Sequence, residues 1–157
     1  MKRRPLVAFT LSILLIASIL VVVIWLAPTR HDHRLTGRAP TSIQSDRDFD
    51  AEHGIVEGSG TVADPYLMED WEIDVSSAGC PSTPCTGIAV QNTSASFIIR
   101  NVKIRGEQYE YGITLSGVKN ARVEGASIVV LKDRIIVVSS TNLTIFGNSV
   151  VANDEGN

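Results

Sequence analysis

Met68-Glu69-Asp70-Trp71-Glu72-Ile73 is the first of four matching stretches of sequence that decide the fold. The later copies begin at Ile99, Val123 and Ile145, and successive copies lie 31, 24 and 22 positions apart. Each copy opens with an apolar residue, has Asp, Asn or Gly in third place and closes with a β-branched residue. A recurring unit of about 20 to 25 residues is the signature of a solenoid.

A second apolar pattern precedes each of the last three copies. Ile88-Ala89-Val90, Ile113-Thr114-Leu115 and Ile135-Ile136-Val137 place apolar residues two apart, which is the period of a β-strand. The Asp, Asn or Gly of the repeat tolerates the left-handed backbone conformation that a sharp corner needs. We therefore predict an all-β chain that forms a right-handed parallel β-helix of about four coils, with two short strands and tight bends in each coil.

Charged residues of the repeat are expected to stack in columns. In adjacent coils about 4.8 Å apart, Glu69, Arg100 and Glu124 would alternate in sign along one column. Glu72 would lie over Lys103 in a second column. We interpret these carboxylates as partners in charge ladders in preference to catalytic acids.

The N-terminal segment predicts a membrane anchor. Lys2-Arg3-Arg4 precedes 22 uncharged residues from Leu6 to Ala27, enough for a transmembrane helix. We favour an uncleaved signal anchor, because this run is longer than the apolar region of a secretory signal and ends without a small-x-small cleavage site; a cleaved signal is the alternative. The predicted organisation is an anchor at 1–28, a juxtamembrane linker without fixed structure at 29–41, an N-terminal cap at 42–66 and the coils at 67–157.

Cysteines and acceptor triplets favour an extracytoplasmic globular part. Cys80 and Cys85 flank a short loop and predict a local disulfide, with a zinc half-site as the alternative. Asn92-Thr93-Ser94 and Asn142-Leu143-Thr144 are glycosylation acceptor sequences. The predicted location is therefore the cell membrane, with a single span and the globular part outside.

Two groups of residues are weak candidates for metal binding. Asp46, Asp48 and Asp50 follow the carboxylate spacing of a calcium loop, but alanine stands where that loop requires glycine. His31 and His33 lack a third fixed ligand for copper. We therefore predict no metal and no cofactor, and interpret these segments as a solvated acidic turn and a polar stretch beside the membrane.

Tyr109 and Tyr111 are the candidate ligand-binding residues. They lie in a predicted bend beside carboxylates, and aromatic faces of this kind suit sugar rings. Packing on the neighbouring coil is the alternative role. A formal charge of −3 and the lack of a basic face with interleaved aromatic residues argue against nucleic acid as a partner.

The string that precedes the repeat is the most specific in the chain. Gly58-Ser59-Gly60-Thr61-Val62-Ala63-Asp64-Pro65-Tyr66 has the pattern G-x-G-T-x-x-D-P-Y, and as a structural element it predicts an N-terminal cap for the solenoid. From about Thr41 to Val150 the chain resembles archaeal surface β-helix proteins. These belong to the broad pectate-lyase-like group that includes NosD-type periplasmic copper proteins and the carbohydrate-binding and sugar-hydrolysis domains.

The resemblance implies a function at the cell surface. The residues on the outer face of the coils favour binding over catalysis. Outward positions of the opening strands hold no stacked acids or bases, and general acid–base catalysis needs two positioned titratable groups. We therefore predict no catalytic residues and favour a non-enzyme: a membrane-anchored module that binds or scaffolds carbohydrate or a cell-surface polymer. The alternatives are a fragment of a polysaccharide lyase or hydrolase whose active coils are absent, and a NosD-type accessory protein for metal delivery.

The last repeat shows no distinct C-terminal cap. Asn153 to Asn157 reads as another bend, so the sequence is either a truncated relative of longer proteins or a chain whose last edge is covered by another copy. We therefore expect edge-to-edge self-association or marginal stability if the chain is whole.

Overall fold

The computed structural model describes residues 34–76, 85–107, 110–130 and 134–152. The chain divides into two compact units, Met1–Asp32 and His33–Asn157, and all described residues belong to the second. In their chain order, the elements of this unit are β1 (Thr36–Arg38), β2 (Thr41–Ile43), the 3-10 helix η1 (Asp46–Asp48), β3 (Tyr66–Glu69), β4 (Trp71–Asp74), β5 (Thr86–Gln91), β6 (Phe97–Arg100), β7 (Lys103–Arg105), β8 (Tyr111–Ser116), β9 (Lys119–Glu124), β10 (Ser127–Val130), β11 (Ile135–Val138), β12 (Thr141–Phe146) and β13 (Ser149–Ala152).

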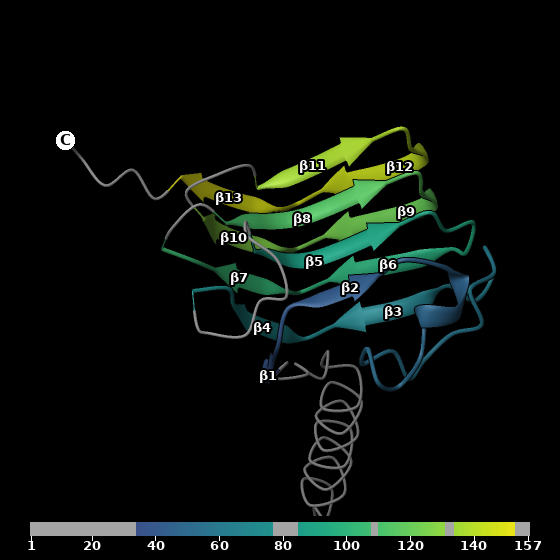
Figure 1. Cartoon of the computed structure of the whole chain (residues 1–157), viewed down its shortest axis with the longest axis horizontal. Coiled ribbons are helices and arrows are strands. Elements are labelled where there is room, and N and C mark those ends of the chain that lie inside the picture. The colour runs from purple at the N-terminus through teal and green to yellow at the C-terminus, as the bar shows by residue number, and fades with distance from the viewer. Residues whose placement is uncertain (1–33, 77–84, 108–109, 131–133, 153–157) are drawn as a thin grey trace, which may run out of the picture. The chain divides into compact units, whose positions relative to one another are not determined.

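These strands form three parallel sheets, as Figure 1 shows. The sheet orders are β1-β4-β7-β10-β13, β2-β5-β8-β11 and β3-β6-β9-β12. Each strand pairs with its counterpart one coil along, and every pairing is parallel. The described part is therefore a parallel β-helix of four stacked coils, which confirms the all-β, parallel part of the predicted fold class.

Each coil has three strands where the sequence analysis expected two. The repeated stretch spans the end of one strand and the start of the next, with the left-handed residue between them. Asp70 (φ 59°), Asn101 (φ 47°), Gly125 (φ 61°) and Gly147 (φ 64°) occupy this corner in successive coils. Because only one or two residues separate the strands at this corner, two short strands looked like one in the sequence.

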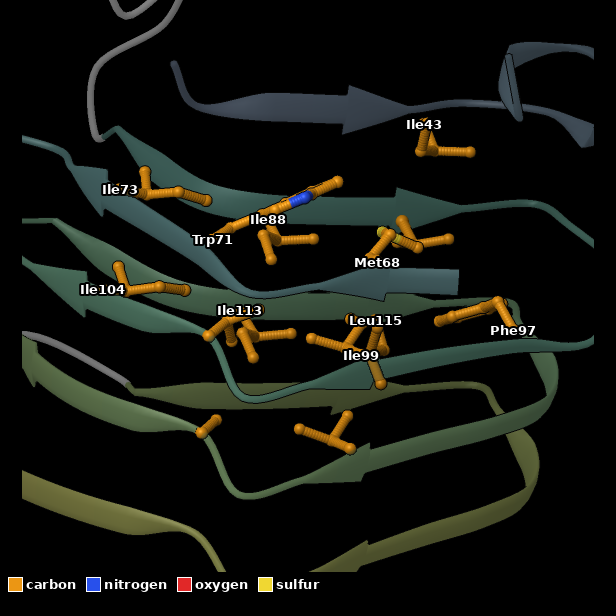
Figure 2. Close-up of a cluster of buried hydrophobic side chains, with 14 of the residues drawn as sticks. Ile43, Met68, Trp71, Ile73, Ile88, Phe97, Ile99, Ile104, Ile113 and Leu115 are labelled. Atoms are coloured by element: carbon orange, nitrogen blue, oxygen red, sulfur yellow. The ribbon is translucent and has the colours of Figure 1, made fainter. Parts of the chain in front are cut away.

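The register is the one that the repeats predict. Met68 pairs with Ile99, Ile99 with Val123, and Val123 with Ile145. After the corner, Ile73, Ile104 and Ile128 lie over one another, and each is fully buried. Figure 2 shows buried aliphatic side chains, Ile73 and Ile104 among them, pointing into the space between the strands. Burial of stacked aliphatic side chains is the main force that stabilises the coils.

Aromatic residues pack together at the N-terminal end of the coils. The ring of Phe49, just after η1, stacks on Tyr66 with centroids 4.6 Å apart and lies 5.7 Å from the ring of Phe97. Trp71 is buried, and the guanidinium carbon of Arg38 lies 4.9 Å from its ring centroid. The cap therefore shares one hydrophobic core with the coils.

Strand β1 corrects the expected linker at 29–41. Thr36, Gly37 and Arg38 pair in parallel with Trp71, Glu72 and Ile73 of β4. The first sheet thus begins inside the segment that we expected to lack structure, and Arg38 of this strand also makes the cation–π contact with Trp71. Leu6 to Ala27 lies outside the described residues. Among the residues that are described, no helix is long and apolar enough to span a membrane.

Candidate functional site

A shallow groove of about 180 Å³ runs across the outer face of the sheet formed by β6, β9 and β12. Val62 and Pro65 of the cap loop form one wall. The polar part of the lining comes from three successive coils: Ser96, Asn120, Arg122, Asn142 and Thr144. Ile98 supplies an apolar patch on the same face.

Asparagine stacking shapes one side of this groove. Asn120 (φ 54°) and Asn142 (φ 54°) both adopt the left-handed conformation, and Asn142 Nδ2 donates a hydrogen bond of 2.5 Å to Asn120 Oδ1. Asparagine tolerates this conformation better than most residues. The stack therefore fixes two amide groups at the mouth of the groove.

Arg122 brings the charge into the groove. Its guanidinium Nη1 lies 3.8 Å from Glu124 Oε2, and its side chain is 52% exposed. A half-exposed pair at this distance contributes little to stability, so the guanidinium is available to an anionic or hydroxyl-rich partner. Among the described residues that line the groove, there is no Asp, Glu or His that would provide general acid–base chemistry.

The predicted charge ladders are present on the outer surface of the coils. Arg100 Nε donates to Glu69 Oε2 at 2.5 Å, and this hydrogen bond is the main reason why the pKa of Arg100 lies above its usual value. Lys103 Nζ lies 3.1 Å from Glu72 Oε1. Arg105 Nε also donates to Asp74 Oδ2 at 3.1 Å. These carboxylates therefore neutralise basic side chains of the next coil.

The three aspartates of the calcium-like spacing do not converge on one point. Asp46 accepts hydrogen bonds from Thr93, Ser94 and Ala95. The other two have local partners: Asp48 Oδ2 accepts from the backbone of Gln44 and Ser45, and Asp50 Oδ1 accepts from the backbone of His53. Within the described residues, no group of three or more His, Cys, Asp or Glu side chains is placed to hold a metal ion.

Several predicted site residues lie outside the described part: His31, His33, Cys80 and Tyr109. Of their companions, Cys85 is buried, and Tyr111 opens β8 with its N–H donating to the Cys85 carbonyl at 2.8 Å. The Cys80–Cys85 disulfide and the sugar contact of the two tyrosines stay predictions. The same holds for glycosylation at Asn92 and Asn142, both of which adopt positive φ.

Asn120, Arg122 and Thr144 are not among the site residues predicted from the sequence. A signal was present, because Asn120 and Asn142 are 22 positions apart, the same spacing as the last two repeats. What could not be foreseen is the wall from the cap loop, since the sequence does not show where Val62 and Pro65 fold back.

Most of the β-helix is related to a known protein family. Residues 59–157 match a family described as periplasmic copper-binding protein (NosD). No curated protein and no solved structure matches the chain significantly. The matched range contains every lining residue of the groove and both charge ladders.

Proposed function

Because the chain belongs to the NosD family of periplasmic copper-binding proteins, we propose that it is an extracytoplasmic accessory protein that presents its β-helix to a copper-handling partner protein. The observation that carries this proposal is the family match, which covers the whole groove face. Attachment to the membrane through Leu6 to Ala27 is part of the proposal, since an anchored scaffold would hold its partner at the cell surface.

The described coils do not offer donors that suit copper. Copper sites draw on imidazole, thiolate and thioether ligands held in a fixed geometry. His53, the histidine of the described part, has Nδ1 2.8 Å from Asp50 Oδ1. Met68 is fully buried in the core, and Cys85 is buried as well. We therefore assign the coils the role of a docking surface and derive no copper chemistry from them.

The groove is the part of that surface best suited to bind a partner. It combines a half-exposed guanidinium, two oriented amides and the exposed hydroxyl group of Thr144 beside an apolar patch. Polar groups held on a rigid sheet lose little conformational freedom on binding. The groove therefore favours a partner segment with acidic and hydroxyl or amide groups.

Copper analysis of the periplasm tests the accessory role. We expect deletion of the gene to remove copper from one protein fraction when the extract is separated by size and each fraction is analysed for metal. The full chain should restore that copper, and Arg122→Ala should restore less of it. Arg47→Ala, which removes an exposed arginine of η1, is the matched control and should restore it fully. A copper profile that deletion leaves unchanged would reject the accessory role.

Carbohydrate is the second candidate partner, and the same groove favours it. Its hydroxyl and amide groups can form hydrogen bonds with a sugar, and Ile98 can contact an apolar face of the ring. We expect a glycan array to bind the full chain, and binding to weaken in Arg122→Ala. The double variant Tyr109→Ala/Tyr111→Ala tests the predicted tyrosine contact separately, because Tyr111 in β8 is not among the residues that line the groove. Arrays that show no binding by the folded chain, or equal binding by Arg122→Ala, would reject this function.

A further inference from the structure

A second cleft, of about 170 Å³, lies where the cap meets the first coil. It shares no lining residue with the groove on β6, β9 and β12. Its lining combines three apolar side chains with one basic and two acidic ones. The lining residues come from β1, the cap, β3 and β4: Thr36, Arg38, Gly54, Val56, Glu57, Leu67, Glu69 and Trp71.

The guanidinium group of Arg38 is fixed in this cleft. Its carbon lies 4.9 Å from the centroid of the Trp71 ring, and Trp71 itself is buried among the core side chains shown in Figure 2. The cap backbone approaches the same group at Gly54, where a Cβ would lie 2.2 Å from the guanidinium carbon. Glycine at this position therefore leaves the space that the guanidinium occupies.

Two charges of this cleft are not paired with each other. In the charge ladders, each basic side chain meets a carboxylate of the neighbouring coil. Glu69 takes part in a ladder, since its Oε2 accepts a hydrogen bond from Arg100. Within the described part of the chain, by contrast, neither Arg38 nor Glu57 has an ion pair. A guanidinium and a carboxylate thus line one small space without neutralising each other.

We infer that this cleft binds a small zwitterion, of the chemical class of free amino acids with an aliphatic side chain. The ligand carboxylate pairs with the guanidinium of Arg38, and the ligand ammonium pairs with the carboxylate of Glu57. Each such hydrogen bond spans about 2.8 Å, so a ligand can bridge two groups that do not reach each other directly.

Size and apolar surface favour the same class of ligand. The cleft is smaller than the roughly 300 to 1,000 Å³ of sites for drug-sized molecules, which favours a small ligand. Val56 and Leu67 offer apolar surface to an aliphatic side chain. The inference does not depend on the proposed accessory function, because the cleft lies apart from the groove.

Titration of the full chain in detergent with defined small molecules tests this inference. The NMR signals of the Glu57 and Leu67 amide groups provide the readout. L-leucine carries both charges, N-acetyl-L-leucine lacks the ammonium and L-leucinamide lacks the carboxylate. We expect L-leucine to bind with a Kd of about 1 mM or tighter, and each derivative to bind about tenfold more weakly or worse, because it leaves one charge of the cleft unpaired.

The variant Glu57→Gln separates the ligand contact from the fold. The Glu57 side chain is exposed, and the backbone carbonyl that accepts from Leu67 N remains in the variant, so the cap should still form. We expect this variant to lose the preference for L-leucine over N-acetyl-L-leucine, because the partner of the ammonium is gone. Glu52→Gln, which changes an exposed glutamate of the cap outside the cleft, is the matched control and should bind like the native chain.

Three results would overturn the inference. The first is a native chain that shows no binding of L-leucine up to about 50 mM. The second is equal binding of L-leucine and its two derivatives, which would show that the charges are not recognised. The third is a Glu57→Gln variant that keeps the full preference for L-leucine over N-acetyl-L-leucine.

Discussion

Asn101 Nδ2 donates a hydrogen bond of 2.6 Å to Asp70 Oδ1 in the neighbouring coil. Both residues adopt the left-handed conformation, with φ of 47° and 59°, at the corner between two sheets. The Asn101 side chain thus offsets the backbone strain at its own corner, and its hydrogen bond links this corner to the one at Asp70. Asp70 and Asn101 start a column that continues with Gly125 and Gly147, where glycine permits the bend without a side-chain hydrogen bond.

Replacement of Asn101 should therefore destabilise the coil by an amount that depends on how easily the new residue adopts the left-handed conformation. We expect Asn101→Ala to lower the free energy of unfolding by about 2 kcal/mol, because alanine loses the hydrogen bond and costs about 1 to 2 kcal/mol in the left-handed region. Asn101→Gly should cost less, because glycine adopts this conformation freely. Urea unfolding compares the two variants, and an alanine variant as stable as the glycine variant would contradict the assignment.

Asp46 should make the attachment of the cap sensitive to acid. Its pKa is lowered from the usual 3.8, chiefly by the hydrogen bond from the Thr93 hydroxyl. Ser94 N and Oγ add hydrogen bonds of 3.0 and 3.1 Å. A lowered pKa means that this stabilisation is complete above about pH 4 and is lost as the pH falls through the folded-state pKa.

Asp46→Asn isolates this contribution. The variant should be less stable than the native chain at pH 7. The difference should shrink as the pH falls from about 4 through the lowered folded-state pKa, because Asp46 of the unfolded chain takes up a proton before Asp46 of the folded chain does. Urea midpoints measured from pH 7 down to strongly acidic pH give the comparison. A difference between the two proteins that stays constant over this whole range would show that Asp46 does not act through its charge.

The Glu69–Arg100 pair should be weakly stabilising and sensitive to salt. The two side chains are 27% and 43% exposed, so solvent screens their attraction. We expect a double-mutant cycle of Glu69→Gln and Arg100→Gln to give a coupling of at most about 1 kcal/mol, which falls at high ionic strength. A larger coupling that salt does not change would indicate a buried catalytic or structural pair instead.

The predicted disulfide between Cys80 and Cys85 should contribute modestly. Closure of so short a loop stabilises a fold by roughly 2 kcal/mol in the chain-entropy description. Peptide mass mapping without reductant should show the two cysteines linked, and reduction should lower the unfolding midpoint. Free thiols at both positions in protein isolated from the periplasm would reject the pairing.

The repeat made the fold predictable because each core position recurs. Once Ile73, Ile104 and Ile128 were aligned, parallel pairing in register was the arrangement that buries all three. Strand number was harder, since only one residue, Asp70, lies between β3 and β4, and only Asn101 and Val102 lie between β6 and β7. Strand β1 could not be predicted, because Thr36–Arg38 precedes the repeats and its pairing with β4 is a contact between segments distant in sequence.

Only part of the groove could be predicted from the sequence, because only some of its residues belong to the repeat. Asn120 and Asn142 recur at the repeat spacing, so their stacking follows from the register. The cap loop does not repeat, and the position of Pro65 beside Phe97 depends on tertiary packing. The ladders, in contrast, followed from spacing alone: Glu69 meets Arg100 as predicted.

Copper binding by the chain itself tests the central claim most directly, namely that the coils act as a docking surface and hold no copper. The full chain with His31→Ala and His33→Ala, dialysed against copper in the presence of a competing chelator, should retain no stoichiometric metal, because its described coils offer no group of copper donors. One tightly held copper ion per chain in that variant would contradict the account.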